Sequence, residues 1–316
     1  MQTILNLGVD VDSRYLVVAC AARSFTPQRI VNERRAISGW LRSLPRGSRL
    51  AMEATGEYHE LLAELACKAG LQVFVINPHD LRRYAQSIGR RGKTDRVDAE
   101  VIARYVAREH DELHTYVAPS KEQRALARFM RRRAKLVVLK GTLTQSLRGL
   151  PSVGAQLKQA TAALDRLIAK VEQLTQRALE GVPAAHDTAT RIATICGFGP
   201  IGSTCLAHSF TRVPYSNSDA VIASTGFDPR PDDSGTRRGR RRLSKHGASE
   251  TRRVMFNCAR SASKTKLWRP YYQAQRAKGL SSTAATVILA RKMIRVAFAV
   301  FRSKEPFDPA RLGFHA

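Results

Sequence analysis

Two carboxylates stand three residues apart within Gly92–Ala99, at the expected start of a helix and directly behind a basic loop. Asp95 and Asp98 would share one face of that helix, because residues at i and i+3 are neighbours on a helix surface. The chain carries a formal net charge of +27, so a local concentration of acids needs a reason. A divalent metal site is one reason. First-turn acids that favour the helix dipole are the simpler alternative.

Two further carboxylates close expected strands. Asp10 ends an apolar strand over residues 3–10, and Glu53 ends a strand over residues 49–53. If these strands are parallel neighbours, both side chains emerge at the same edge of the sheet. Asp12 competes with Asp10 as a ligand, and Asp10 is preferred because it follows directly on the apolar run.

Four carboxylates repel one another unless a cation relieves them, and oxygen-only ligation indicates Mg²⁺ or Mn²⁺. Two such ions about 4 Å apart can activate the attacking oxygen and stabilise the leaving oxygen of a phosphodiester. The sequence therefore predicts a nuclease-type metal site.

The elements that must position these acids form an α/β domain. A hairpin followed by strand–helix–strand predicts a sheet of mixed direction, closed by a helix that starts at Asp95. The expected strands cover residues 3–10, 15–22, 28–32, 49–53 and 71–76, the expected helices 36–43, 58–70 and 95–108, and a basic loop residues 82–93.

A long helical region follows. Residues 121–147 and 155–179 are predicted helices broken by Pro151–Gly154, and the second has apolar residues at heptad-like intervals. Two antiparallel helices and a coiled-coil arm that dimerises fit equally well. The first helix carries Arg131, Arg132 and Arg133 as candidates for nucleic-acid binding.

The last third combines a glycine turn with a basic loop. Ile195–Ser203 resembles a helix-hairpin-helix element, whose helix N-terminus can hold a phosphate. Residues 228–249 have almost no apolar content and predict an exposed, mobile loop, followed by helices over about 250–264 and 282–303. Trp268 is expected to cap a core rather than to stack on bases.

The positive charge is unevenly distributed along the chain. Residues 1–115 hold 17 Lys and Arg against 14 Asp and Glu, so most of the +27 lies in the remainder. A pI near 10.9 indicates a polyanionic partner, with nucleic acid as the default. No apolar run approaches the roughly 20 residues that span a bilayer, and no membrane partner is expected. The five scattered cysteines predict reduced thiols in the cytoplasm rather than a zinc site or disulfides.

Several motifs together resemble the DEDD transposases of the IS110 family of bacterial insertion sequences and the related Piv-type DNA invertases. In the first half they are Gly8–Val11, Met52–Tyr58 and Gly92–Ala99. In the second half they are Gly197–Pro200 and Thr225–Gly235, followed by Lys245 and Gly247. Ser13 departs from the commonest pattern, in which many members carry Lys at a position that is not a ligand.

The resemblance implies three sections: a RuvC-like (ribonuclease H-like) catalytic domain over 1–115, a helical coiled-coil section over 116–187, and a mainly α-helical C-terminal transposase domain over 188–316. It implies metal ligation by Asp10, Glu53, Asp95 and Asp98, with Ser234 as the nucleophile by motif position. The composite site would draw on two subunits of a homodimer or homotetramer. A structured non-coding guide RNA would pair with donor and target DNA, in a cytoplasmic, nucleoid-associated bacterial protein.

Basic residues near these motifs are the expected contacts to nucleic acid: Lys93, Arg131, Arg132, Arg133, Arg237, Arg238, Arg240 and Lys245. By itself, an Asp-Asp-Ser-Gly stretch is usually only a turn, and Tyr58 is a rival nucleophile close to Glu53. Three other functions remain open: a site-specific DNA invertase, a RuvC-like structure-specific nuclease, and a nucleic-acid-binding protein whose acids are only structural.

Overall fold

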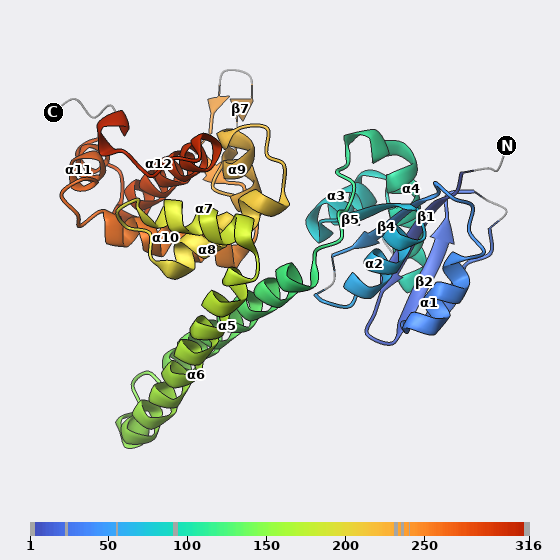
Figure 1. The fold of residues 1–316 in the computed structure, drawn as a ribbon, viewed down its shortest axis with the longest axis horizontal. Coiled ribbons are helices and arrows are strands. Elements are labelled where there is room, and N and C mark those ends of the chain that lie inside the picture. The colour runs from blue at the N-terminus through green and yellow to red at the C-terminus, as the bar shows by residue number, and fades with distance from the viewer. Residues whose placement is uncertain are drawn as a thin grey trace. The chain divides into compact units, whose positions relative to one another are not determined.

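The computed structural model describes residues 4–22, 25–54, 56–90, 94–230, 233–234, 237–239 and 241–312. The chain divides into two compact units, Met1–Ala118 and Pro119–Ala316 (Figure 1). The helices that follow Ser120 therefore belong to the same unit as the C-terminal helices. The predicted division into three functional sections stays a prediction.

The first unit contains a five-stranded mixed sheet, as predicted, with strand order β3-β2-β1-β4-β5. The hairpin β1–β2 and the edge strand β3 pair antiparallel, whereas β1, β4 and β5 are parallel. The strands are β1 (Asn6–Val11), β2 (Tyr15–Cys20), β3 (Gln28–Val31), β4 (Arg49–Glu53) and β5 (Gln72–Ile76).

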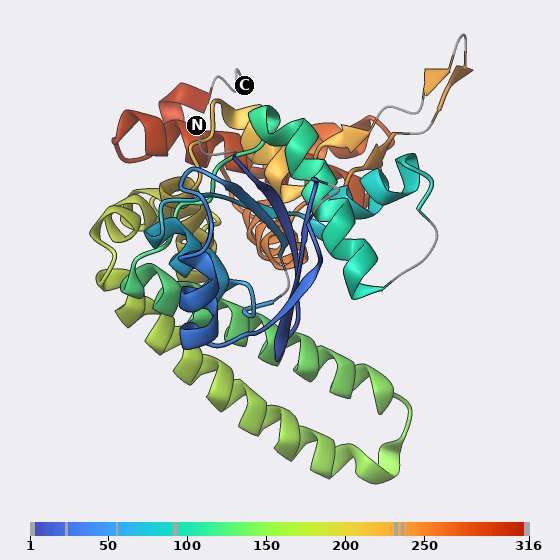
Figure 2. The same ribbon diagram turned by 90° about the vertical axis from the view of Figure 1, so that its right-hand side faces the viewer.

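Helices cover both faces of this sheet. In Figure 2 the blue helix α1 and the green helix α4 lie on opposite sides of the strands. Leu7, Val9 and Val11 of β1 pack with α1 and α2, while Ile102 and Val106 of α4 pack with residues of β4 and β5. The helices are α1 (Arg34–Leu41), α2 (Glu60–Lys68), α3 (Pro78–Ser87) and α4 (Asp95–Glu109), followed by a 3₁₀ turn at His110–Glu112.

Gly8 lets α4 lie directly on the central strand. A Cβ atom at Gly8 would overlap the amide nitrogen of Ala103 and the carbonyl oxygen of Ala99. The alternation of β1 puts Gly8 and Asp10 on the α4 face of the sheet, because successive side chains point to opposite faces. The close approach of α4 is therefore built into the same face that carries the first predicted ligand.

The predicted basic loop over residues 82–93 is wrong in its first part, where the structure has helix α3. Asn77 and Pro78 suggest a turn, but the Asn77 side chain accepts a hydrogen bond from the His79 amide at 2.9 Å and Pro78 occupies the first helical turn. Leu81 is buried and anchors the helix. Lys93 lies outside the described residues.

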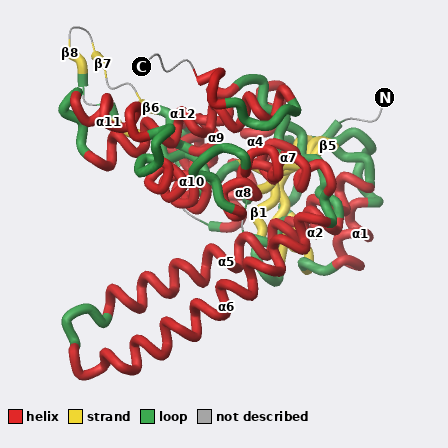
Figure 3. Tube along the Cα trace, turned by 60° about the vertical axis from the view of Figure 1, so that its left-hand side comes forward, coloured by secondary structure: helices red, strands yellow, loops and turns green. Residues whose placement is uncertain are grey.

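In the second unit, α5 (Lys121–Ser146) and α6 (Gly154–Glu180) run side by side (Figure 3). Ser120 and Gln123 form a capping box at the start of α5, and Lys140 pairs with Asp165 across the two helices at 2.6 Å. Of the two arrangements expected from the heptad pattern, the pair of antiparallel helices within one chain is present.

The remaining helices pack around α12 (Ser282–Ser303), and the indole of Trp268 is fully buried among them, as expected. They are α7 (Pro183–Ala193), α8 (Pro200–Arg212), α9 (Ser218–Thr225), α10 (Ser249–Ala262) and α11 (Arg269–Ala277). Short 3₁₀ turns lie at Pro151–Val153 and Pro309–Leu312. No helix in the described ranges is both long and apolar enough to cross a membrane.

The segment expected as an irregular loop over 228–249 contains two pairs of two-residue strands. Here β6 (Pro229–Arg230) pairs with β9 (Arg242–Leu243), and β7 (Asp233–Ser234) pairs with β8 (Arg237–Arg238). The low apolar content concealed these ladders, which are defined by backbone hydrogen bonds.

Replacing Gly8 with alanine should displace α4, because the new Cβ meets main-chain atoms that no rotamer change can move. We expect Gly8→Ala to lower the free energy of unfolding by about 1–3 kcal/mol. Gly39→Ala is the matched control: Gly39 lies in α1 with open space around it, and alanine there should be neutral or stabilising by up to about 1 kcal/mol. Urea denaturation followed by circular dichroism measures both, and a Gly8→Ala protein as stable as the wild type would contradict this packing.

Candidate active site

Parallel pairing of β1 with β4 brings the first two acids together. Gly8 pairs with Ala51 and Val9 with Met52, so Asp10 and Glu53 occupy the next position of the same register. Both lie on the face covered by α4, as the alternation along each strand requires. The expected neighbourhood of these two strands is therefore present.

The second pair of acids begins α4. The Thr94 hydroxyl accepts a hydrogen bond from the Val97 amide at 3.3 Å and caps the helix. Asp95 and Asp98 fall in the first turn, where their charge also interacts favourably with the helix dipole. Because α4 lies on Gly8, this turn sits beside the carboxyl ends of β1 and β4.

All four predicted ligands line one cavity of about 330 Å³. Its other walls come from the β1–β2 hairpin and from β3. The complete lining is Asp10, Val11, Asp12, Tyr15, Val17, Arg29, Glu53, Asp95 and Asp98. Residues separated by up to 88 positions in the sequence thus present their carboxylates to a common space.

The electrostatics of Asp10 reflect this convergence. The pKa of its carboxyl is raised from the ordinary 3.8 to about 6, first by burial and then by the negative charges of Asp95, Asp98 and Glu53. A proton or a cation at this point would relieve the repulsion among the four groups. The donor set consists only of carboxylate oxygens, which fits Mg²⁺ or Mn²⁺ rather than a soft metal.

Asp12 lines the same cavity, but its carboxylate accepts hydrogen bonds within the β1–β2 turn. Its carboxylate accepts hydrogen bonds from the Arg14 amide at 3.3 Å and from the Ser13 hydroxyl at 3.4 Å. Hydrogen bonds from the backbone of Ser13 and Arg14 lower the pKa of this exposed carboxyl. The geometry supports the preference for Asp10 over Asp12 as a ligand.

Arg29 and Tyr15 belong to the cavity and were missed from the sequence. The guanidinium carbon of Arg29 lies 3.9 Å from the centre of the Tyr15 ring, in a cation–π contact. The signal for this pair is the β2–β3 register, which places Tyr15 opposite Val31 and Arg29 opposite Val17. That register cannot be read from strand patterns alone.

Ser234 is exposed on β7 and pairs with Arg237 of β8 in a hairpin that projects from the helices of the second unit (Figures 2 and 3). Arg238 pairs with Asp233 in the same ladder. Arg240 lies outside the described residues. Tyr58, the rival nucleophile, is half exposed and does not line the carboxylate cavity.

The base of the Ser234 hairpin is fixed to α9 and α10. The Arg252 guanidinium donates to the carbonyl oxygens of Thr225 and Gly247, at 3.1 Å and 2.5 Å. The exposed Lys245 has a left-handed backbone with φ of 55°, and its amide donates to the Gly226 carbonyl at 3.1 Å. The ends of the predicted mobile loop are therefore hydrogen-bonded to helices.

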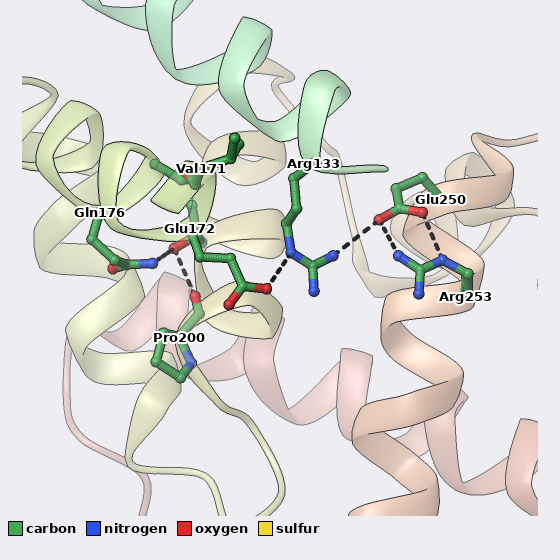
Figure 4. Close-up of polar contacts among 9 residues, drawn as sticks. Arg133, Val171, Glu172, Gln176, Pro200, Glu250 and Arg253 are labelled. Atoms are coloured by element: carbon green, nitrogen blue, oxygen red, sulfur yellow. Dashed lines mark hydrogen bonds and ion pairs between the residues drawn. The ribbon is translucent and has the colours of Figure 1, made fainter. Parts of the chain in front are cut away.

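The three consecutive arginines of α5 do not share one environment. Arg133 is 15% exposed and pairs with Glu172 at 2.7 Å and with Glu250 at 3.5 Å, and Glu250 also pairs with Arg253 (Figure 4). Its charge is thus used to join α5, α6 and α10. Arg132 is exposed and Arg131 half-buried. Nucleic-acid binding by these three residues stays a prediction.

The glycine turn between α7 and α8 is present where a helix-hairpin-helix element was expected. Gly197 has φ of 102°, and a Cβ there would meet the Ala262 side chain at 2.6 Å. The Trp268 indole donates to the Cys196 carbonyl at 2.9 Å and holds the turn against the core. Phosphate binding by this turn stays a prediction.

Comparison with known families covers most of the chain in two blocks. Residues 7–152 match a family model described as a transposase, that of the DEDD transposases of IS110 elements. Residues 189–273 match the model described as the IS116/IS110/IS902 transposase family. The chain belongs to the IS110 family of transposases. The four clustered carboxylates lie in the first block and Ser234 in the second.

Relatives of the same family have two kinds of name. The pilin gene-inverting protein of Moraxella bovis is 25% identical over 82% of this chain and 81% of its own length. The transposase for insertion sequence element IS1328 of Yersinia enterocolitica is 27% identical over 79% of this chain and 83% of its own. An insertion element IS116 protein of Streptomyces clavuligerus is 30% identical over 39% of this chain and 32% of its own.

Removing one neighbouring charge should make Asp10 more acidic. We expect Asp95→Asn to lower the pKa of Asp10 from about 6 towards 3.8, because the charge of Asp95 is the largest of the three that raise it. Carbon-13 NMR of the aspartate carboxyl groups in metal-free protein follows the titration. Asp111→Asn, at an 86% exposed side chain outside the cavity, is the control and should leave the pKa of Asp10 unchanged. An equal shift in both variants would show that Asp95 is not a close neighbour.

The raised pKa of Asp10 also determines how this carboxyl changes the stability of the fold with pH. A carboxyl whose pKa is raised on folding opposes folding when ionised, so its contribution is unfavourable above about pH 6 and vanishes below about pH 4. Asp10→Asn should remove this part of the pH dependence.

Proposed function

We propose that this member of the IS110 family is a DNA transposase that cuts and rejoins DNA strands with a divalent cation held by Asp10, Glu53, Asp95 and Asp98. The observation that carries the proposal is the convergence of these four carboxylates on one cavity, within a chain of net charge +27. The mixed sheet, with a hairpin β1–β2 and parallel β4 and β5, supports a RuvC-like domain as its scaffold.

Mg²⁺ or Mn²⁺ bound there would supply Lewis-acid stabilisation of charge on the phosphodiester oxygens. The strands and helix α4 hold the four carboxylates in position around the cation site. Asp10 and Glu53 are held by adjacent parallel strands, and Asp95 and Asp98 by the capped first turn of α4. Rigid elements thus fix all four groups, which a metal site of defined geometry needs.

Ser234 is the proposed nucleophile. Its oxygen would attack a DNA phosphorus, forming a serine–phosphate ester as the bond to the leaving strand oxygen breaks. The hydroxyl proton would leave Ser234 and the departing oxygen would end protonated, so charge and atoms balance. Rejoining reverses the step, with a strand hydroxyl displacing the serine. The exposure of Ser234 on a hairpin supports access to a phosphate.

Guidance by a structured RNA and assembly as a homodimer or homotetramer are further parts of the proposal. They rest on the resemblance of the motifs to the family. The excess of basic residues beyond residue 115 supports extensive contact with nucleic acid, which need not be sequence-specific. If base pairing supplies the sequence specificity, the protein itself reads only the backbone and the shape of the nucleic acid.

A site-specific DNA invertase is the second candidate, because two relatives are named pilin gene-inverting proteins. Both functions use the same strand exchange and differ in the arrangement of the DNA ends. A plasmid with two sites in inverted orientation and a plasmid carrying the mobile element separate them by their products. Hydrolysis of branched DNA without rejoining would instead indicate a RuvC-like nuclease.

Each cavity ligand should be required for strand cleavage. We expect Asp10→Asn, Glu53→Gln, Asp95→Asn and Asp98→Asn each to slow cleavage about 100-fold or more, since losing several kcal/mol of transition-state stabilisation has that effect. Cleavage of labelled DNA carrying the element junction, with the RNA encoded beside the gene, measures the rate. Binding of the same DNA should stay within about threefold of the wild type.

Asp12→Asn is the matched control for this series, because Asp12 lines the cavity but caps a turn. It should retain most of the cleavage activity. Full activity in any of the four ligand variants would refute the metal site.

Ser234→Ala should abolish the covalent protein–DNA adduct, because alanine has no oxygen to form the ester. Denaturing gels of labelled DNA show the adduct directly. Tyr58→Phe is the control and should leave it intact. An adduct that survives in Ser234→Ala and disappears in Tyr58→Phe would assign the nucleophile to Tyr58.

A further inference from the structure

The first unit has a second cavity, lined by four arginines among mostly apolar residues, that the proposed strand chemistry does not use. Its volume is about 600 Å³, and its walls come from the end of β2 with the turn after it, from residue 90 after α3, and from α4. The charged residues in its lining are Arg90, Arg96, Glu100, Arg104 and Arg108. Two separate segments, the residue after α3 and helix α4, therefore contribute arginines to one space.

The lining keeps an excess of positive charge. Among the described residues of the lining, Glu100 is the only acid, and it pairs with Arg96 at 3.2 Å and with Arg90 at 3.6 Å. One carboxylate cannot neutralise four guanidinium groups, so a ligand of this cavity must be anionic. Small side chains of Ala19, Ala21 and other alanines form the floor and leave room for a bulky anion.

The basic cavity and the carboxylate cavity are both lined by residues of β2 and α4. On β2, Val17 lines the carboxylate cavity and Ala19 the basic one, about 7 Å further along the strand. On α4, Asp98 and Arg104 are six residues apart, a rise of about 9 Å. At about 3.4 Å of helix rise per nucleotide, these separations correspond to a few nucleotide steps.

We propose that the basic cavity binds the phosphate backbone of a nucleic-acid strand, a few nucleotides from the phosphate that enters the carboxylate cavity. The position relative to the carboxylate cavity rests on the proposed function, whereas the binding of the phosphate backbone does not. The row Arg96, Arg104 and Arg108 along one side of α4 can donate to consecutive phosphates, because guanidinium groups bind phosphate oxygens in a bidentate manner. The contact is with the backbone and carries no base specificity.

The test measures binding of the full-length chain to two probes: a 30-base-pair DNA duplex of mixed sequence and a 30-nucleotide RNA. The double variant Arg104→Gln/Arg108→Gln should weaken binding on the order of tenfold at moderate salt, because hydrogen bonds to charged groups contribute about that much. The slope of log affinity against log salt should become shallower by about 2, which is about 1 for each of the two lost phosphate contacts. Fluorescence anisotropy across a salt series gives both quantities.

Arg34→Gln/Arg35→Gln is the matched control. It removes the same charge from exposed residues of α1, on the opposite face of the sheet. We expect less than a twofold change in affinity and an unchanged salt slope. An equal loss in both double variants would overturn the proposal, because it would show that only the net charge matters.

Glu100→Gln should change the affinity for nucleic acid in the opposite direction. Removing this carboxylate releases Arg90 and Arg96 and should tighten binding about two- to fivefold, with a steeper salt slope. Weaker or unchanged binding in Glu100→Gln would overturn the proposal, since a merely structural cavity predicts no gain.

The two probes identify the source of the backbone. If Arg104→Gln/Arg108→Gln loses affinity for DNA, for RNA or for both, the result supports the proposal and identifies the nucleic acid that the cavity binds. If its affinity for both probes is unchanged, the proposal is overturned. All these readouts are binding measurements and need no strand cleavage. A chain that shows them but never cuts DNA would refute the proposed function and leave the basic cavity assigned.

Discussion

The contact between α4 and the central strand is the constraint on which the acid cluster depends. At Gly8 the backbone of β1 meets the backbone of α4 without an intervening side chain. Ala99 and Ala103 on the helix carry only a methyl group, and their main-chain atoms occupy the space that a Cβ at Gly8 would need. This approach brings Asp95 and Asp98 beside Asp10. A larger residue at any of these positions would separate the two pairs of carboxylates.

Such a cluster opposes folding, and the rest of the unit must offset it. The raised pKa of Asp10 shows that burial and three neighbouring charges disfavour its ionised form. The sheet compensates with apolar cores on both faces, from Leu7, Val9 and Val11 on one side to Ile102 and Val106 on the other. A fold that stores repulsion at one point is typical of a site that awaits a cation.

Much of this site could be predicted from the sequence, because strand ends and a helix start are local features. Asp10, Glu53, Asp95 and Asp98 were each found from the element that carries them, whereas the parallel pairing of β1 with β4 was only a condition of the prediction, which the structure meets. The Arg29–Tyr15 pair could not be found, since it depends on the register of an edge strand. Helix α3 was mistaken for a loop, because Asn77 and Pro78 serve equally well as a turn and as a helix start. The Arg133 ion pairs were missed because they join three helices whose packing no local pattern fixes.

Helix α4 carries acidic residues that line one cavity and basic residues that line another. Asp95 and Asp98 line the carboxylate cavity, whereas Arg96, Arg104 and Arg108, eight and four residues apart, line the basic one. Because a helix moves as a rigid element, any shift of α4 displaces both sets of residues together. A strand held by the arginines would then keep its position relative to the acids. Placing the anchor and the acids on one helix thus couples the position of the backbone to the chemistry, and Gly8 fixes that helix to the sheet.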